Sequence, residues 1–278
     1  MPYRLAHYYV GFVLLVVVTG FWASYFAPIA RPMPLGFHVH AITSIMWLLL
    51  LLVQIIAIQA RQNPLHRQLG LASFALFPLL MLGFVMIINV SADRFGARES
   101  PFIAHVGPAF GLGMGGALVA YLTLFYLAMK HRHKVRLHAG YMLATPMILF
   151  ESPFSRLMDA YFPWMNVIGS EGPQALLDTI AVSNSLVTIF ALALWVRTRK
   201  NGAPWLVAAG FMTANSILMW FAPAWLWAGP LFDAYAAVPD VVSCALAIGA
   251  GLAAGWLGWR AAPPRLGRRE PREAAALA

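Results

Sequence analysis

The sequence predicts an all-α integral membrane protein, a bundle of about eight transmembrane helices with both termini in the cytoplasm. Three observations predict this fold class. Only 10% of the 278 residues are charged, whereas 61% are hydrophobic and the mean hydropathy is +0.71. A soluble protein has about 25% charged residues, so this chain has too few to cover a water-exposed surface. The third observation is a series of apolar runs near the length of about 20 residues that a spanning helix needs.

Eight apolar segments follow one another along the chain, separated by short stretches with turn residues. Their expected bounds are 8–27, 37–60, 65–90, 102–129, 136–152, 174–196, 204–222 and 238–259. Proline is tolerated in the first turn of a helix, where its missing N–H costs no hydrogen bond. Four prolines mark starts in this way: Pro64, Pro101, Pro173 and Pro204. The first segment follows Arg4 but lacks a small-residue cleavage site, which favours a retained helix over a signal peptide.

The fifth segment is the weakest of the eight, because it is short and contains Pro146. Whether it crosses the membrane completely is left open by the sequence. We expect one transmembrane domain over residues 1–260, with core helices at about 37–152, and a basic, disordered cytoplasmic tail at 261–278. The only cysteine, Cys244, excludes an intrachain disulfide and a cysteine-based zinc or iron–sulfur site.

The basic residues are unevenly distributed between the two sides of the expected bundle. If the segments alternate in direction, 15 of the 19 Lys and Arg residues lie on the side that holds both termini. Basic residues in short connections mark the cytoplasmic side, so the termini are expected there, in a bacterial inner (plasma) membrane. The same distribution explains the net charge of +9 without nucleic acid, because these residues orient the chain and meet anionic lipid in the bilayer.

Five histidines near the expected helix starts are the main functional candidates, since ionisable groups inside a membrane mark functional sites. His38, His40 and His105 fall toward the outer side, whereas His66 and His138 fall toward the cytoplasm. Two imidazoles on facing helices can supply both axial ligands of a haem iron. The placement therefore predicts two sites for haem b, an outer one from His40 with His105 and an inner one from His66 with His138.

His40 also begins a polar stripe along its helix. Ser44 and Trp47 follow at i+4 and i+7, and the stripe continues to Gln54 and Arg61. Residues at this spacing share one helix face. A polar face on an apolar span normally faces the bundle rather than lipid, so we expect this face to point inward.

The outer histidines allow a second interpretation, a metal site. His38, His40 and His105 together with Glu151 offer the nitrogen and oxygen ligands that such a site needs. The plainer alternative is that these side chains lie at the membrane interface and form hydrogen bonds there. In the same region Gly107, Gly111 and Gly115 share a helix face, which favours close helix packing over contact with a flat cofactor.

Two stretches resemble a family of uncharacterised bacterial multi-pass membrane proteins. They are HVHAITSIMWLLLLLVQ…LHRQLG, residues 38–70, and KVRLHAGYMLATPMI, residues 134–148. In that family a helix with a His, a Trp and a Gln is followed by a short loop and an H-R-x-L-G start. The resemblance covers residues 36–150 approximately and implies a membrane location but no reaction.

The alternating histidines also resemble those of the cytochrome b-561 transmembrane reductases. These proteins bind two b-type haems through one histidine on each of four central helices. The resemblance implies the same pairs, His40 with His105 and His66 with His138, and electron transfer within the membrane with a quinone or another redox partner. That family has six helices, where this chain has eight expected segments.

Three functions are compatible with these residues. The first is a b-type haem or metal protein for electron transfer within the membrane. The second is a cofactor-free membrane protein that binds or transports a small molecule, or assists the assembly of a respiratory complex. The third is a metalloenzyme that uses the histidine–carboxylate cluster. The sequence does not decide whether the chain is an enzyme.

Overall fold

The computed structural model describes residues 3–263, and the regular secondary structure in this range is all helical. The α-helices are α1 (Ala6–Gly20), α2 (Leu35–Gln59), α3 (Asn63–Gly96), α4 (Pro101–Lys130), α5 (Val135–Tyr161), α6 (Gln174–Arg197), α7 (Ala203–Phe221), α8 (Ala228–Ala236) and α9 (Asp240–Arg260). Shorter helical turns occupy Trp22–Phe26, Pro163–Met165, Arg199–Asn201 and Ala222–Ala224. The tail predicted to be disordered lies outside the described residues from position 264 onward.

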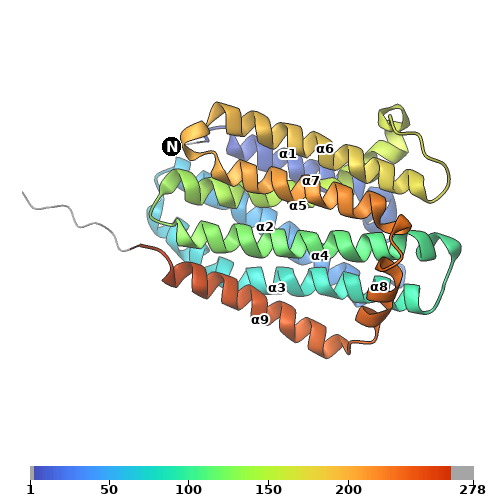
Figure 1. The fold of residues 1–278 in the computed structure, drawn as a ribbon. Coiled ribbons are helices and arrows are strands. Elements are labelled where there is room, and N and C mark those ends of the chain that lie inside the picture. The colour runs from blue at the N-terminus through green and yellow to red at the C-terminus, as the bar shows by residue number, and fades with distance from the viewer. Residues whose placement is uncertain (1–2, 264–278) are drawn as a thin grey trace, which may run out of the picture.

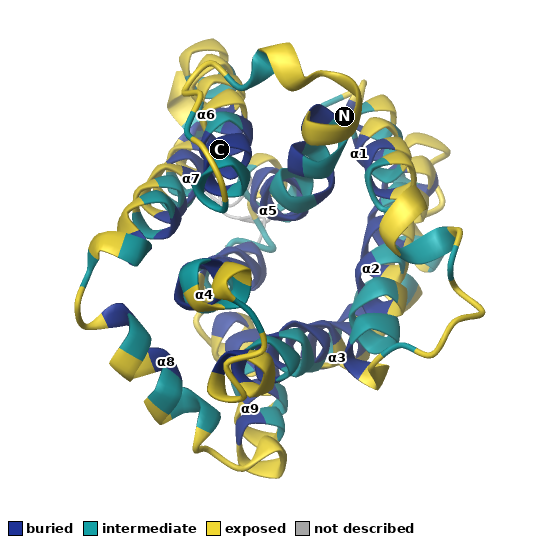
Figure 2. Cartoon of the chain, turned by 90° about the vertical axis from the view of Figure 1, so that its right-hand side faces the viewer, coloured by how far each residue is buried: buried dark blue, intermediate teal, exposed yellow. Residues whose placement is uncertain are grey.

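The long helices lie side by side as a bundle, and α8 crosses one of its ends (Figure 1). Viewed along the bundle, α4 and α5 lie at the centre, and α1, α2, α3, α9, α7 and α6 surround them (Figure 2). The contacts agree with this view, because α4 packs on α3, α5, α7 and α9, and α5 packs on α1, α4, α6 and α7. Of the expected core helices, α4 and α5 are therefore central, whereas α2 and α3 belong to the surrounding layer.

Six helices are long and apolar enough to cross a membrane: α2, α3, α4, α6, α7 with the turn that follows it, and α9. The protein is thus an all-helical chain compatible with a multi-pass position in a lipid bilayer. Helices also form at the other two expected spans, but α1 has only 15 residues, and α5 is not among the six. With 27 residues, α5 is about 40 Å long. It has the length to cross, and the count of eight spans stays a prediction.

Proline starts are confirmed at three of the expected positions. Pro64, Pro101 and Pro204 each lie in the first turn of α3, α4 and α7. Ser100 precedes α4, and its hydroxyl accepts a hydrogen bond from the backbone N–H of Ile103 at 3.2 Å. A serine at this position satisfies one of the N–H groups that have no partner within the helix, so the start of α4 is specified by side-chain chemistry as well as by proline.

The fifth helix is longer than its apolar run predicted. It continues past position 152 to Tyr161, with Pro146 and Pro153 in its interior. A Cβ atom on Gly20 would overlap the backbone of Pro153, so glycine allows α1 to lie directly against α5 at this point. A proline inside a membrane helix is tolerated where neighbouring helices satisfy the backbone groups that it frees. Such packing joins distant parts of the chain, so local sequence patterns do not predict it.

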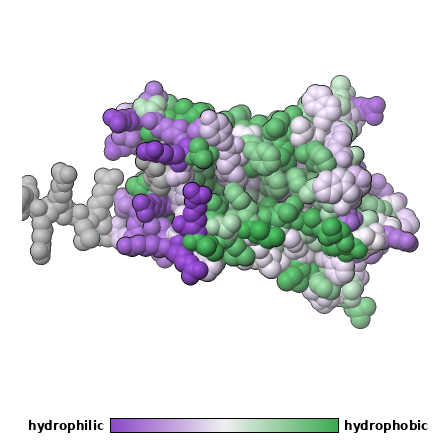
Figure 3. All heavy atoms as spheres, turned by 90° about the horizontal axis from the view of Figure 1, so that it is seen from above, coloured by the Kyte–Doolittle hydropathy of each residue, from purple (hydrophilic) through white to green (hydrophobic). Residues whose placement is uncertain are grey.

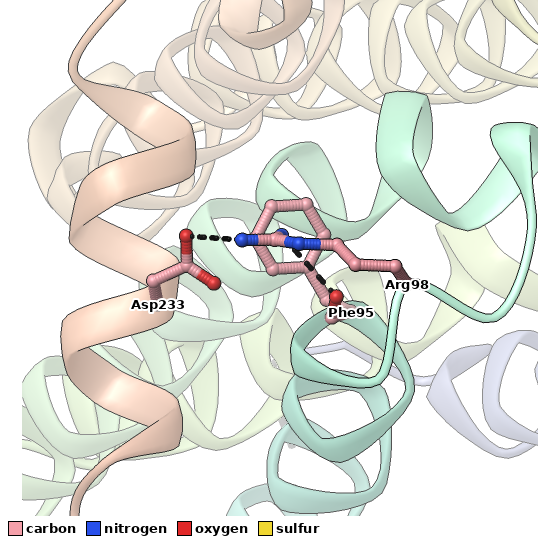
Figure 4. A network of polar contacts seen from close by, with 3 residues as sticks. All are labelled: Phe95, Arg98 and Asp233. Atoms are coloured by element: carbon pink, nitrogen blue, oxygen red, sulfur yellow. Dashed lines mark hydrogen bonds and ion pairs between the residues drawn. The ribbon is translucent and has the colours of Figure 1, made fainter.

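Helix α8 was not predicted from the sequence, and it lies between the seventh and eighth expected segments. It is held to the end of α3 by contacts that include a hydrogen bond from the Tyr235 hydroxyl to Oδ1 of Asn89 at 2.6 Å. The ring of Phe232 lies 5.3 Å from that of Phe95, centroid to centroid. The Arg98 guanidinium lies over the Phe95 ring at 4.6 Å and donates to the Asp233 carboxylate at 2.8 Å (Figure 4). At nine residues, α8 is too short to be recognised as a span.

Two of the three glycines on the predicted face of α4 receive aromatic side chains. A Cβ atom on Gly107 would lie 2.9 Å from the Phe95 ring, and one on Gly111 would overlap Phe232. Gly115 has open space beside it. The packing interpretation of this glycine face is therefore supported at Gly107 and Gly111.

Lys and Arg gather at the end of the bundle where α1 begins, which we call the basic end (Figure 3). The described chain has 15 Lys and Arg residues, and 11 of them lie there: Arg4, Arg61, Arg67, Lys130, Arg132, Lys134, Arg136, Arg197, Arg199, Lys200 and Arg260. The Asp and Glu residues between positions 3 and 263 all lie toward the opposite end. The expected charge separation is thus present in the fold, whereas its assignment to the cytoplasm stays a prediction.

Candidate functional site

The helix directions divide the candidate histidines into the two expected sets. His38 and His40 in α2 and His105 in α4 lie toward the opposite end, whereas His66 in α3 and His138 in α5 lie at the basic end. His38 is bonded locally, since its Nδ1 lies 3.0 Å from the hydroxyl of Tyr25. The haem and metal predictions then depend on what the other four side chains contact.

The predicted stripe on α2 points into the bundle at Ser44 and Trp47, whereas Arg61 lies past the end of α2 and is exposed. Ser44 and Trp47 are fully buried, and the indole N–H of Trp47 donates to the Thr145 hydroxyl of α5 at 2.9 Å. The His40 ring meets the Phe84 ring of α3 edge-on at 4.8 Å. Its Nδ1 and the Ser44 hydroxyl are buried without a hydrogen-bond partner among the described residues.

His105 belongs to a separate polar network that joins three helices. Its Nε2 lies 2.8 Å from Oε1 of Gln174 in α6, and the Gln174 amide donates to the carbonyl of Trp220 in α7 at 3.1 Å. The Trp220 indole N–H donates to the buried Asp178 carboxylate at 2.8 Å. Ser170 completes the network, because its backbone N–H and its hydroxyl both donate to Asp178.

The structure therefore gives the two histidines of the predicted outer pair different partners. His40 packs on Phe84 of α3, and His105 is bonded to Gln174 of α6. Helices α2 and α4 both pack on α3 and α5, but they make at most marginal contact with each other. No contact among the described residues supports the pairing of His40 with His105 on one haem iron.

Each histidine of the inner pair has a hydrogen-bond partner on a neighbouring helix. The Gln54 amide lies on the predicted stripe of α2. In the amide orientation that satisfies both of its neighbours, its nitrogen donates to Nδ1 of His66 and its oxygen accepts from the Gly70 N–H at 3.0 Å. His138 donates from Nδ1 to the Ala128 carbonyl at 2.9 Å, so Nε2 of its neutral ring keeps a lone pair.

The predicted metal ligands do not form one cluster. Within residues 3–263 there is no group of three or more His, Cys, Asp or Glu side chains that could hold a metal ion. Glu151 lies beside Arg156, while Arg156 donates to the Ser152 carbonyl and hydroxyl and lies over the Phe21 ring. His38, His40 and His105 each have the separate surroundings described above, so the metalloenzyme hypothesis has no geometric support.

A feature that the sequence analysis missed is a cavity of about 830 Å³ at the basic end, between α1, α5, α6 and α7. We call it the basic-end cavity. Five of its lining residues are cationic: Arg4, Arg136, Arg197, Arg199 and Lys200. These residues flank four helix ends, and this could be seen in the sequence. It did not indicate a cavity, because positive charge at helix ends is expected of any membrane protein. Only the fold shows that these five surround one space.

The rest of the basic-end cavity is mainly apolar and aromatic. Leu143 of α5, Phe190 and Leu194 of α6 and Trp205 of α7 line it. Tyr3 lies at its rim, where its ring meets that of Trp205 edge-on at 5.6 Å and its hydroxyl donates to the Arg136 carbonyl. Burial raises the pKa of the Tyr3 phenol, against the opposing effect of Arg136, so this hydroxyl stays protonated at neutral pH.

A second cavity of about 630 Å³ lies between α3 and α9 and has a different character. Its lining residues are Leu71, Phe74, Leu252, Ala253, Trp256 and Trp259. Leu71, Leu252 and Trp256 are exposed on the surface of the bundle. An apolar surface hollow of this kind suits contact with lipid chains and offers no polar group that would select a ligand.

Comparison of the chain with protein-family models, with curated proteins and with solved structures finds no match in any of the three. The two family resemblances therefore stay predictions. The function has to be argued from the geometry of the cavity and of the histidines.

Proposed function

We propose that this chain is a multi-pass protein of the bacterial inner membrane that binds a small molecule in the basic-end cavity, without a resident cofactor. The cavity is the single observation that carries the proposal. Ligand sites are typically concave spaces of about 300–1,000 Å³ with apolar walls and a few polar groups. The volume of about 830 Å³ and the mixed lining satisfy both conditions.

The position of the cavity relative to the bilayer follows from the charge distribution. Basic residues in short connections face the cytoplasm, so the basic end, and with it the cavity mouth, belongs on the cytoplasmic side. The walls formed by Phe190 and Leu194 lie on α6, one of the six helices with the length and composition of a span. The ligand is therefore held at the level of the inner leaflet, between water and hydrocarbon.

A cavity-filling variant tests this proposal. Leu194 lines the cavity, and Leu192 is exposed on the same helix. The protein is purified from bacterial membranes in a mild non-ionic detergent, and native mass spectrometry measures any bound small molecule. We expect a bound mass in the wild type and in Leu192→Trp, and its loss in Leu194→Trp. Equal occupancy in Leu194→Trp, or a wild type with no bound mass, would contradict the proposal.

A second candidate function is binding of one b-type haem between His66 and His138, with a quinone or a protein as the redox partner. It is favoured by the position of both histidines at the basic end and by the lone pair on Nε2 of His138. One contact opposes it. Because Gln54 donates to Nδ1 of His66, the proton of that neutral ring lies on Nε2, and the ring must change tautomer to bind iron through Nε2.

An absorption spectrum decides the second candidate. The protein is expressed with added haem precursor, purified, and measured before and after reduction with dithionite. A Soret band and sharp reduced α-band that are lost in His138→Ala and kept in His38→Ala would support it. A colourless preparation would exclude the haem function and leave the small-molecule function standing.

A further inference from the structure

We infer, on the basis of the proposed function, that the ligand of the basic-end cavity is an anionic amphiphile with a phosphate monoester head and a hydrocarbon chain. The head would lie among the cationic side chains, and the chain would lie against the apolar walls. The inference rests on three features of the described residues: the chemistry of the cationic groups, the lack of internal partners for them, and the direction in which the apolar wall leads.

The basic-end cavity has more cationic groups than are needed to bind a single carboxylate. Four guanidinium groups and one ammonium group line the cavity. Arginine binds phosphate oxygens through two parallel N–H donors, and charge-assisted bonds of this type are stronger than neutral ones. A phosphate monoester carries nearly two negative charges at neutral pH and has three terminal oxygen acceptors. It can therefore engage several of these groups at once.

Three of the five cationic side chains have no partner within the described chain. The side chains of Arg4, Arg197 and Lys200 form no hydrogen bond, ion pair or ring contact with another described residue. Elsewhere at the basic end, Lys130 lies over the Tyr126 ring and Arg260 over the Trp256 ring. The described carboxylates all lie toward the opposite end. Positive charge around the cavity is thus uncompensated by any carboxylate within residues 3–263.

The apolar wall leads from the cationic groups toward the hydrocarbon region. Arg197 and Phe190 lie seven residues apart on α6, which is about 10 Å along the helix axis. Phe190 is 44% exposed on the bundle surface, and its ring lies 5.9 Å from that of Tyr9 on α1. A chain that follows this wall reaches the lipid-facing surface between α1 and α6, which both pack on α5.

The positive-inside rule alone does not explain this arrangement. That rule requires basic residues near the cytoplasmic ends of helices, and Arg61 and Arg67 satisfy it while lining no part of this cavity. The cationic residues of the cavity come from positions 4, 136, 197, 199 and 200, which are brought together only by the packing of four helices. This difference provides a matched control for the experiment.

The experiment measures binding of three probes to the full chain in non-ionic detergent by native mass spectrometry titration. The probes are hexadecyl phosphate, the neutral hexadecanol and inorganic phosphate. We expect hexadecyl phosphate to bind at least about tenfold more tightly than either of the others. The double variant Arg197→Gln/Lys200→Gln should weaken hexadecyl phosphate about 10- to 30-fold, because each basic group near an anionic head contributes about a factor of five. The control Arg61→Gln/Arg67→Gln should leave it unchanged.

The outcomes separate the inference from the proposed function. If hexadecanol binds as tightly as hexadecyl phosphate, the anionic head is wrong while the cavity remains a small-molecule site. If inorganic phosphate competes as well as the amphiphile, the hydrocarbon chain is wrong. Equal weakening by the control variant would assign the effect to general surface charge and overturn the inference. Failure of every probe, together with an unchanged bound mass in Leu194→Trp, would overturn both.

Discussion

Nε2 of His105 in α4 lies 2.8 Å from Oε1 of Gln174 in α6. This relationship decides how the outer histidines are interpreted. A histidine whose ring nitrogen is engaged by a neighbouring amide has a structural role that needs no iron. The same glutamine donates to the Trp220 carbonyl of α7, so one side chain joins three helices at the end opposite the basic end.

We predict that Gln174→Leu destabilises the fold. The substitution removes the partners of the His105 ring nitrogen and of the Trp220 carbonyl, which lie in partly buried positions. A polar group left without a partner costs at most about 1–3 kcal/mol in the free energy of unfolding, the value for a buried group. The apparent Tm in detergent should fall measurably. The control is Gln68→Leu, since Gln68 is exposed and forms no side-chain hydrogen bond with the described residues. An unchanged Tm in Gln174→Leu would show that the network carries no stability.

The close approach of α2 and α3 leads to a second prediction. A Cβ atom on Gly83 would lie 2.7 Å from the Thr43 hydroxyl and 2.9 Å from Cα of His40. Because a backbone atom is among the obstacles, the helices must move apart, and Gly83→Ala should cost about 1–3 kcal/mol. Gly115→Ala meets nothing within 4 Å and should leave the Tm nearly unchanged. Equal Tm values for the two variants would argue against the contact.

A third prediction concerns the bond from Trp47 to Thr145 in the bundle interior. Thr145→Val keeps the shape of the side chain but removes the acceptor of the indole N–H, which is fully buried. The expected loss of about 1–3 kcal/mol comes from the donor left without a partner. Thr43→Val is the matched control, because the Thr43 hydroxyl donates only to carbonyls of its own helix. We expect its effect on the Tm to be clearly smaller.

The orientation of the chain can be tested with its cysteine content. Cys244 is the only cysteine, so Cys244→Ser supplies a background for labelling. A membrane-impermeant maleimide should label Glu171→Cys in intact cells, because position 171 lies at the end opposite the basic end. Lys134→Cys should react only after the membrane is permeabilised, since positive charge in short connections stays in the cytoplasm. The reverse labelling pattern would place the basic-end cavity outside the cell.

Local sequence predicted where the long helices lie, but it predicted the residues at which they begin and end less consistently. Proline and serine specify the start of α4 through their backbone chemistry. The continuation of α5 through Pro153 and the formation of α8 depend instead on neighbours. Gly20 lets α1 cover the backbone of Pro153, and Phe232 packs α8 onto Phe95. Contacts of this kind join residues far apart in the chain, so no window of the sequence contains them.

The composition and order of residues by themselves determined the helical membrane class, the separation of charge between the two ends and the division of the histidines into two sets. These features depend only on position along the chain. Because successive long helices run in opposite directions, the position of a residue in the sequence sets the end of the bundle at which it lies. Only the tertiary structure decided which side chains meet. It engaged His105 with Gln174, joined His138 to the Ala128 carbonyl, and gathered Arg4, Arg136 and Arg197 around one cavity. The physical reason is that charge orients each helix on its own, whereas partners are selected by the packing of all helices together.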